Sequence, residues 1–404
     1  MPTFSYTAKS LKGETTEAVR EAENEKELAK ILRQEGFILI KAGPLKKSKF
    51  KKEISFPFLG GVSLKEKIMF TRNLQVMVSA GLGLARALNT LASQSQNKRL
   101  KNVLLGVREG IIGGKSFSAG IHQYSNVFSD FYYHLVKVGE ESGTLEKSLG
   151  EITAHLEKEY ALRSNIRGAL MYPAVIILAM IGILILMLLV VIPKLAETFI
   201  QMNIELPFTT KLIMGASLFL AERWYLVILI IFCLVFLIGI LLKTKIGNKI
   251  IDYLFLQLPI FAPLIKKSNS AYAIRTLATL MDAGLPILQS LNIISDALGN
   301  FYFKKSIIEA GQKVKAGKNL SESLEFFANL YSPMVLQMIG VGEQTGQTSN
   351  ILKKTADFLE EEVTKTTQNL ASVIEPIIIL LVGGAVGFLA VSIIQPIYQM
   401  TGAM

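Results

Sequence analysis

The stretch Val138-Gly139-Glu140-Glu141-Ser142-Gly143 returns 203 residues later as Val341-Gly342-Glu343-Gln344-Thr345-Gly346. Both copies keep the first glycine, the first glutamate and the last glycine. Glycine is favoured just beyond a helix because it adopts the left-handed backbone conformation without steric cost. The hexapeptide therefore predicts a turn between two helices that the chain uses twice.

The same offset holds on both sides of this turn. Upstream, Arg72 matches Arg275, and downstream Pro173 matches Pro376. About one hundred residues align without a gap, and a duplicated unit of that length is a domain. We therefore predict two homologous domains in one chain.

Helix start and stop signals predict six helices in each copy. In the first copy, Ser63 with Glu66 forms a capping box, and the glycines at 81 and 83 end the first helix. The last predicted helix continues through Tyr172 into an apolar segment. We assign residues 63–171 to the first repeat and residues 243–375 to the second.

Three apolar runs without a charged residue interrupt the repeats, at 172–192, 225–242 and 376–398. Each approaches the roughly 20 residues that a helix needs to cross a bilayer. Together with a mean hydropathy of +0.41, they predict three transmembrane helices. The glycines of the last span include a G-x-x-x-G pair, which allows close helix packing in lipid; they are Gly383, Gly384 and Gly387.

The charge distribution predicts the orientation of the spans. Residues 1–171 carry 26 basic and 17 acidic side chains, whereas residues 193–224 carry three of each. Excess positive charge marks the cytoplasmic side. No secretory signal peptide is visible, so we expect a cytoplasmic N-terminus, a periplasmic loop at 193–224 and a periplasmic tail at 399–404.

The chain begins with a smaller unit. Residues 1–42 predict a small α/β fold, with a strand at 4–9, a helix that ends near Arg33 and an apolar run at 37–40. Asn24 and Glu27 form a possible capping box. Residues 43–62 form a basic linker that either contacts anionic lipid or is solvated. The fold class is thus an all-α polytopic membrane protein with two homologous six-helix cytoplasmic bundles, three transmembrane helices and a small N-terminal α/β unit.

The paired turns supply the candidate functional residues. Glu140 and Glu343 either cap a neighbouring helix or pair with Arg72 or Arg275, or they contact a partner protein or another subunit. The candidate contact residues are Arg72, Gly139, Glu140, Gly143, Arg275, Gly342, Glu343 and Gly346.

Catalytic chemistry has no support in the sequence, so we expect no enzyme, no cofactor and no metal. The residues from Gly110 to Ser116 imitate a phosphate-binding loop, but the first glycine of that motif falls on Glu109. The three histidines have no ligand spacing, and Cys233 is the only cysteine. Positive charge without a basic–aromatic stripe does not indicate nucleic acid.

A membrane transporter or permease subunit remains an alternative. Ion-coupled transporters usually need ionisable residues within the membrane, and the three spans carry none. A sensor is disfavoured because the outer loop of about 32 residues is small for a ligand domain. A scaffold is therefore the leading interpretation.

Six stretches of the chain carry a family resemblance: Phe70-Thr71-Arg72-Asn73-Leu74, Ser79-Ala80-Gly81-Leu82, Val138 to Gly143, Tyr172-Pro173, Glu205-Leu206-Pro207 and Gln395-Pro396-Ile397-Tyr398. With them the chain resembles the type II secretion F-protein family, the inner-membrane platform proteins of type II secretion and type IV pilus machines. The resemblance covers essentially the whole chain.

The resemblance implies a location and partners. Such proteins are expected in the bacterial inner membrane, above a cytoplasmic assembly ATPase and below the growing fibre. The implied partners are that ATPase, pilin or pseudopilin subunits, other inner-membrane assembly proteins, further copies of the same chain and the lipid bilayer. Gln344 stands where the first copy has Glu141. If both acidic residues of the first turn are needed, the two turns do not have equal roles.

Overall fold

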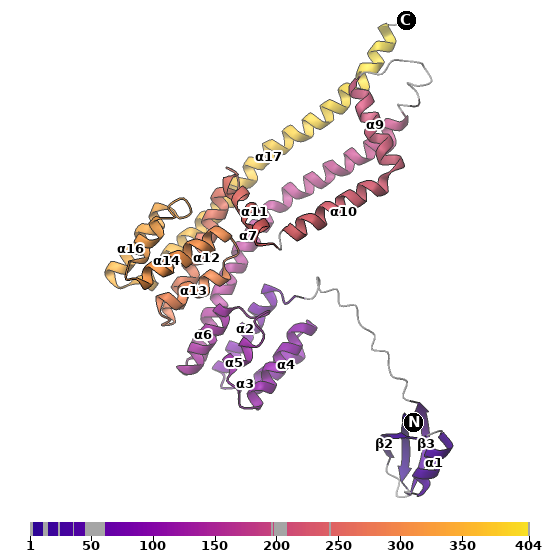
Figure 1. Ribbon diagram of the computed structural model, residues 1–404, viewed down its shortest axis with the longest axis vertical. Helices are drawn as coiled ribbons and strands as arrows, with labels where there is room; N and C mark the ends of the chain where they lie inside the picture. Colours follow the sequence, from indigo (N-terminus) through magenta and orange to yellow (C-terminus); the bar gives the residue numbers. More distant parts are fainter. Residues whose placement is uncertain are drawn as a thin grey trace. The chain divides into compact units, whose positions relative to one another are not determined.

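The computed structural model describes residues 3–10, 15–22, 25–34, 36–44, 61–194, 197, 208–241 and 244–402. The chain divides into two compact units, Met1–Gly61 and Val62–Met404, which are described separately (Figure 1). The predicted tail at 399–404 belongs to a helix as far as Gly402, and the predicted capping residue Asn24 lies outside the described residues.

The first unit is a three-stranded antiparallel sheet with one helix. Its elements are β1 (Thr3–Ser10), β2 (Thr15–Glu21), α1 (Glu25–Gln34) and β3 (Phe37–Pro44), with strand order β2-β1-β3. Leu28 and Leu32 of α1 pack on Ala8 and Ala22. The strand β2 was not predicted, because the run from Thr15 to Glu21 holds only two apolar residues and its pairing with β1 depends on tertiary structure.

The second unit contains both repeats. The helices of repeat 1 are α2 (Leu64–Ser79), α3 (Leu84–Gln94), α4 (Lys98–Ile112), α5 (Phe117–His122), α6 (Asp130–Glu141) and α7 (Leu145–Leu186). Those of repeat 2 are α12 (Ala262–Asp282), α13 (Ile287–Ala297), α14 (Phe301–Lys315), α15 (Leu320–Glu325), α16 (Pro333–Thr345) and α17 (Thr348–Gly402). Between them lie η1 (Met187–Val191), α9 (Phe208–Glu222), α10 (Trp224–Leu241) and α11 (Lys245–Gln257).

Local signals position the helix ends. Ser63 and Glu66 form the predicted capping box at the start of α2. Gly81 and Gly284 follow the first helix of each repeat with φ of 77° and 89°, a backbone conformation that other residues adopt only with strain. The chain therefore turns at equivalent places in both repeats.

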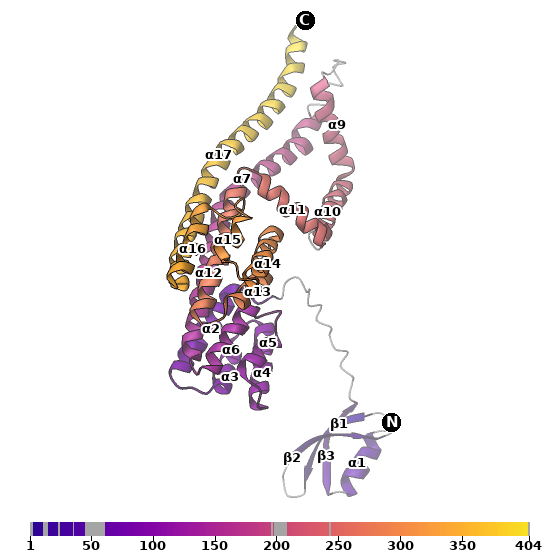
Figure 2. The same ribbon diagram turned by 60° about the vertical axis from the view of Figure 1, so that its left-hand side comes forward.

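The two long helices connect the repeats to the apolar segments. α7 has 42 residues and continues into η1, while α17 has 55 residues and extends roughly 80 Å at about 1.5 Å per residue. Pro173 lies inside α7, and Pro376 lies inside α17. The parts of α7 and α17 that belong to the repeats lie side by side, as both views show (Figures 1 and 2).

Among the described residues, two helices are long and apolar enough to cross a membrane: α7 with η1, and α17. The α9–α10 and α11–α12 pairs qualify only when each is joined across a bend of 90° or 114°. The predicted spans at 172–192 and 376–398 lie within the first two. The predicted span at 225–242 corresponds to α10, and Leu242 lies outside the described residues.

The segment that we predicted as a periplasmic loop contains the helix α9. The hydroxyl of Thr210 donates to the carbonyl of Ser392 over 2.8 Å, and that of Ser217 donates to the carbonyl of Leu188 over 2.5 Å. Ile213 packs between these helices. α9 therefore packs on both η1 and α17, which hydropathy alone did not indicate.

Candidate functional site

Glu140 lies near the end of α6 and binds the first turn of α5. The backbone N–H of Phe117 donates to one carboxylate oxygen over 2.6 Å, and that of Ser118 donates to the other over 2.8 Å. The first N–H groups of a helix lack partners within it, and negative charge there is favoured by the helix dipole. Glu140 therefore caps a helix that is distant from it in sequence.

Glu343 does the same in repeat 2. Its carboxylate accepts the backbone N–H of Leu320 over 2.5 Å, and from Ser321 both the N–H over 3.1 Å and the hydroxyl over 2.7 Å. Of the structural alternatives left open by the sequence, capping is the one that the geometry shows. A contact from either turn to a partner or to another subunit stays a prediction.

The glycines of the turns have two different roles. A Cβ on Gly139 would lie 2.6 Å from Cβ of Ser148 and 3.1 Å from Cα of Leu145, so this glycine lets α6 approach α7 closely. A Cβ on Gly342 would lie 3.2 Å from Cα of Thr348. By contrast, Gly143 and Gly346 have open space but adopt φ of 71° and 67°. The first glycine of each turn thus allows packing, and the last allows the backbone to reverse.

Arg72 and Arg275 do not bind the turn glutamates. Each binds the last helix of its own repeat, through Glu157 for Arg72 and through Glu360 for Arg275, where the distance is 2.7 Å. Glu157 and Glu360 are themselves equivalent under the 203-residue offset. This ion pair joins the first helix of a repeat to its long helix, and like the glutamate cap it is made by equivalent residues in both copies.

Repeat 2 extends its ion pair into a network that reaches α7. Asp357 binds Arg275 over 2.5 Å, and Lys158 of α7 lies 3.3 Å from both Asp357 and Glu360. We call these four residues, Lys158, Arg275, Asp357 and Glu360, the junction network. It ties the two long helices together just before their apolar segments.

The pKa values in the junction network follow from these contacts. Burial lowers the pKa of Arg275, but the hydrogen bonds and charges of Glu360 and Asp357 outweigh it and leave that pKa raised. Burial raises the pKa of Asp357, yet Arg275 and Lys158 bring it below the usual value. The pKa of Lys158 is raised by the two carboxylates against the effect of burial. Lys158, Arg275 and Asp357 are therefore charged near neutral pH.

Comparison of the two repeats at the 203-residue offset identifies only part of the junction network. Lys158 corresponds to Glu361, and Asp357 corresponds to Ala154, so both residues differ between the copies. A search for repeated residues finds Arg72, Arg275 and the paired glutamates but passes over residues that are present once. Lys158 and Asp357 can be recognised only from the tertiary contacts that they make.

A buried histidine lies next to the junction network. His155 of α7 stacks on Phe131 with ring centroids 4.1 Å apart, and its ring lies 6.0 Å from that of Tyr272 in α12. Its Nδ1 has no hydrogen-bond partner, and a cavity of about 20 Å³ adjoins it. Burial lowers the pKa of His155 to about 3, so the ring is neutral at physiological pH.

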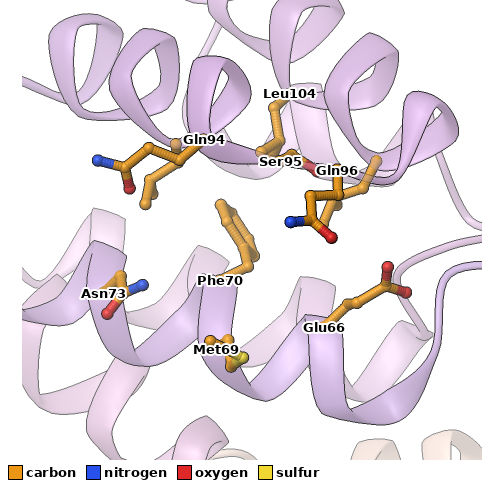
Figure 3. A pocket seen from close by; sticks show the side chains of 10 residues that line it. Glu66, Met69, Phe70, Asn73, Gln94, Ser95, Gln96 and Leu104 are labelled. Carbon is orange, nitrogen blue, oxygen red and sulfur yellow. The ribbon is translucent and has the colours of Figure 1, made fainter.

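Repeat 1 also carries an open pocket of about 410 Å³ between α2 and the α3–α4 region (Figure 3). Phe70 rises from α2 into its middle, with Met69 and Asn73 along one side and Gln94 opposite (Figure 3). The pocket has an apolar floor and an amide-rich rim. The carboxylate of Glu66 also lines the pocket, so the lining suits an apolar group rather than an anion.

The remaining candidate residues lie apart from these contacts. A Cβ on Gly383, Gly384 or Gly387 would meet no atom within 4 Å, so within the described residues no other span packs on this stripe. The described part of the chain also holds no cluster of three His, Cys, Asp or Glu side chains that could bind a metal ion.

Comparison with known proteins matches both repeats and the first unit. The profile of the family described as type II secretion system (T2SS), protein F matches residues 70–193 and 273–396, two ranges related by the same 203-residue offset. The profile of the type II secretion system protein F N-terminal domain matches residues 1–43.

Individual relatives match over nearly full length. A type IV pilus assembly protein PilC of Myxococcus xanthus is 33% identical over 401 residues, which is 99% of this chain and 95% of the relative. A protein of the same description from Thermus thermophilus is 32% identical over 405 residues, covering 100% and 99%. A type II secretion system protein F of Vibrio cholerae is 28% identical over 406 residues, covering both chains completely.

Proposed function

The chain belongs to the type II secretion system protein F family, and from that premise we propose that it is the inner-membrane platform of a type IV pilus or type II secretion machine. In this role it couples a cytoplasmic assembly ATPase to the insertion of pilin or pseudopilin subunits into the fibre. It performs no catalysis of its own. The names of its relatives, which include both pilus and secretion proteins, support this class of machine.

The observation that carries the proposal is the continuity of α7 and α17. Each helix runs without a break from a repeat into an apolar segment, and the junction network fixes one helix against the other. A helix is stiff along its axis, so displacement of a repeat by a partner moves the attached span. The arrangement suits transmission of force across the membrane surface.

The topology that we propose has three crossings, at α7 with η1, at α10 and at α17, with the N-terminus inside and the C-terminus outside. α12 is no crossing, because Arg275 in its middle binds carboxylates of α17. Ile246, Ile250 and Leu254 form an exposed apolar stripe on α11, one helical turn apart. Because α11 follows α10 directly, this stripe suits the cytoplasmic face of the bilayer.

The proposal is tested in a strain that lacks the gene, scored for surface fibres by electron microscopy and for secreted proteins in the medium. We expect one of the two to be lost and to return with the wild-type gene. If both fibres and secretion persist without the gene, the assigned function is wrong. Binding of the purified assembly ATPase to the full chain in nanodiscs tests the ATPase contact separately.

The junction network gives a sharper version of the same experiment. Lys158→Glu places a third carboxylate beside Asp357 and Glu360, so we expect loss of fibres or secretion at normal protein level. Lys158→Arg keeps the positive charge beside both carboxylates and is expected to keep activity. Lys147→Glu is the matched control, because Lys147 lies on the same helix and, within the described part of the chain, forms an ion pair only with Glu151 of its own helix.

A further inference from the structure

The two repeats of this chain pack against each other through different faces. His155 and His134, on α7 and α6 of repeat 1, contact Tyr272 on α12 and Gln289 on α13 of repeat 2. We call the surface of α6–α7, and its equivalent on α16–α17, the last-helix face. The surface of α2–α3, and its equivalent on α12–α13, is the first-helix face.

A symmetric pairing of the repeats would form each contact twice. The second set, obtained with the 203-residue offset, would place Phe358 against Met69 and Gln337 against Arg86. Instead Met69 is 56% exposed and Phe358 is 40% exposed. Among the described residues, no hydrogen bond, ion pair or ring contact joins α2 or α3 to α16 or to residues 348–375 of α17. The pairing is heterologous, so one face of each kind stays open.

We propose that a second copy of this chain covers these faces. The last-helix face of repeat 2 in one copy docks on the first-helix face of repeat 1 in the next. The contact between copies then repeats, with equivalent residues, the contact already made within each chain. The backbone of α2–α3 has the same fold as that of α12–α13, which repeat 1 covers. A second copy offers the surface equivalent to the one that covers α12–α13, and for this reason we choose it as the occupant of α2–α3.

The side chains on the two open faces are complementary in polarity. Met69 and Val76 form an exposed apolar row on α2, and the pocket around Phe70 lies beside it (Figure 3). On the other open face, Phe358 and Val341 are exposed apolar side chains. Their counterparts in repeat 1 are the buried His155, which faces Tyr272, and the half-buried Val138.

The charges also fit. Arg275 has two carboxylate partners and its side chain is 9% exposed, whereas the side chain of Arg72 is 59% exposed and binds Glu157. Repeat 1 lacks the second carboxylate because Ala154 replaces Asp357. Glu361, the exposed counterpart of Lys158, comes from the neighbouring copy and supplies it. The sign change from lysine to glutamate compensates for the lost aspartate.

The long helices set the direction in which a second copy is added. Lys158 lies beside Glu360, and Asn165 lies 3.5 Å from Thr364, so α7 and α17 run parallel. A second copy that docks in the equivalent way therefore also keeps its long helices parallel to these two. This agrees with the proposed membrane topology, in which all copies have the same orientation, and it rests on the proposed function.

The test uses single-cysteine variants of the full chain in membranes, on a Cys233→Ser background that has no other cysteine. Met69→Cys and Phe358→Cys carry different tags and are co-expressed, then oxidised. We expect a disulfide-linked dimer only when both variants are present. Arg86→Cys with Gln337→Cys is an independent pair with the same expectation, and Ile112→Cys, exposed at the end of α4, is the control that does not cross-link with Phe358→Cys.

The charge prediction is tested on the second pair of cysteines. Arg72→Glu is expected to reduce the cross-linking yield several-fold, and the swap Arg72→Glu with Glu361→Arg is expected to restore it. Cross-linking of Met69→Cys to itself indicates a two-fold interface and overturns the proposal. So does the absence of cross-links from both pairs. If cross-links form only after removal of residues 1–61, the N-terminal unit covers the face and the proposal is wrong.

Discussion

Substitution of Glu140 by alanine distinguishes a helix cap from a partner contact. In the structure, its carboxylate accepts the N–H groups of Phe117 and Ser118 over 2.6 Å and 2.8 Å. Glu140→Ala leaves both without an acceptor at the start of a six-residue helix. Glu141→Ala is the matched control, because the neighbouring Glu141 is exposed and, among the residues that the structure describes, pairs only with Lys137 over 3.8 Å.

The magnitude follows from the two bonds. A hydrogen bond to a charged group is worth about 1.5–3 kcal/mol net. Water partly replaces the acceptor at this half-buried site, so we expect a loss of about 1–3 kcal/mol for the pair, similar to other lost caps. Since about 1.4 kcal/mol is a factor of ten, local opening becomes roughly 5- to 140-fold more frequent. Glu140→Gln keeps one acceptor and is expected to lose about half as much.

Hydrogen exchange on the full chain in nanodiscs measures this opening directly. Exchange is expected to accelerate at the amides of Phe117 and Ser118 and along α5, with the rest of repeat 1 little changed. Glu141→Ala is expected to exchange like wild type. If Glu140→Ala abolishes fibres or secretion while exchange at α5 stays at the wild-type rate, the capping argument is refuted and the residue is a partner contact.

Three further predictions concern other parts of the chain. Burial lowers the pKa of His155, so its contribution to the free energy of unfolding is fully present above the unfolded pKa of about 6.5 and is lost as the pH drops. Between pH 7 and pH 5 we expect the free energy of unfolding to fall by about 2 kcal/mol, and we expect this loss to be absent in His155→Phe. Denaturant unfolding at both pH values measures the difference. Gly139→Ala is expected to cost about 1–3 kcal/mol by overpacking against α7, measured as a lower unfolding midpoint, and an unchanged midpoint would contradict the close approach. A spin label at residue 250 is expected to collide with oxygen more than with an aqueous nickel reagent, and a label at residue 248 to show the reverse; equal behaviour would place α11 away from the bilayer.

The sequence by itself determined the features that depend on local signals. The duplication, the glycine turns, the cap at Ser63 and the helix bounds around Glu140 all follow from residue type and spacing. The apolar runs at 172–192 and 376–398 lie in continuous helices, as an uncharged stretch of that length predicts. These features need no knowledge of which surfaces meet.

Tertiary structure alone decided what each repeated residue contacts. Sequence allowed Glu140 to bind Arg72, but the helix that approaches its carboxylate is α5. Sequence gave no reason to single out Lys158, because its role depends on the proximity of α17 and it has no counterpart of the same charge. It also left β2 and the docked helix α9 unrecognised.

The physical reason is the duplication itself. Two copies of one fold carry the same two faces, so the pattern of residues specifies each bundle without specifying which face is covered. That choice depends on the few positions where the copies differ, such as Ala154 against Asp357, and on how the connecting segments let the bundles meet. Only the folded chain shows that His155 faces Tyr272 while Met69 stays open.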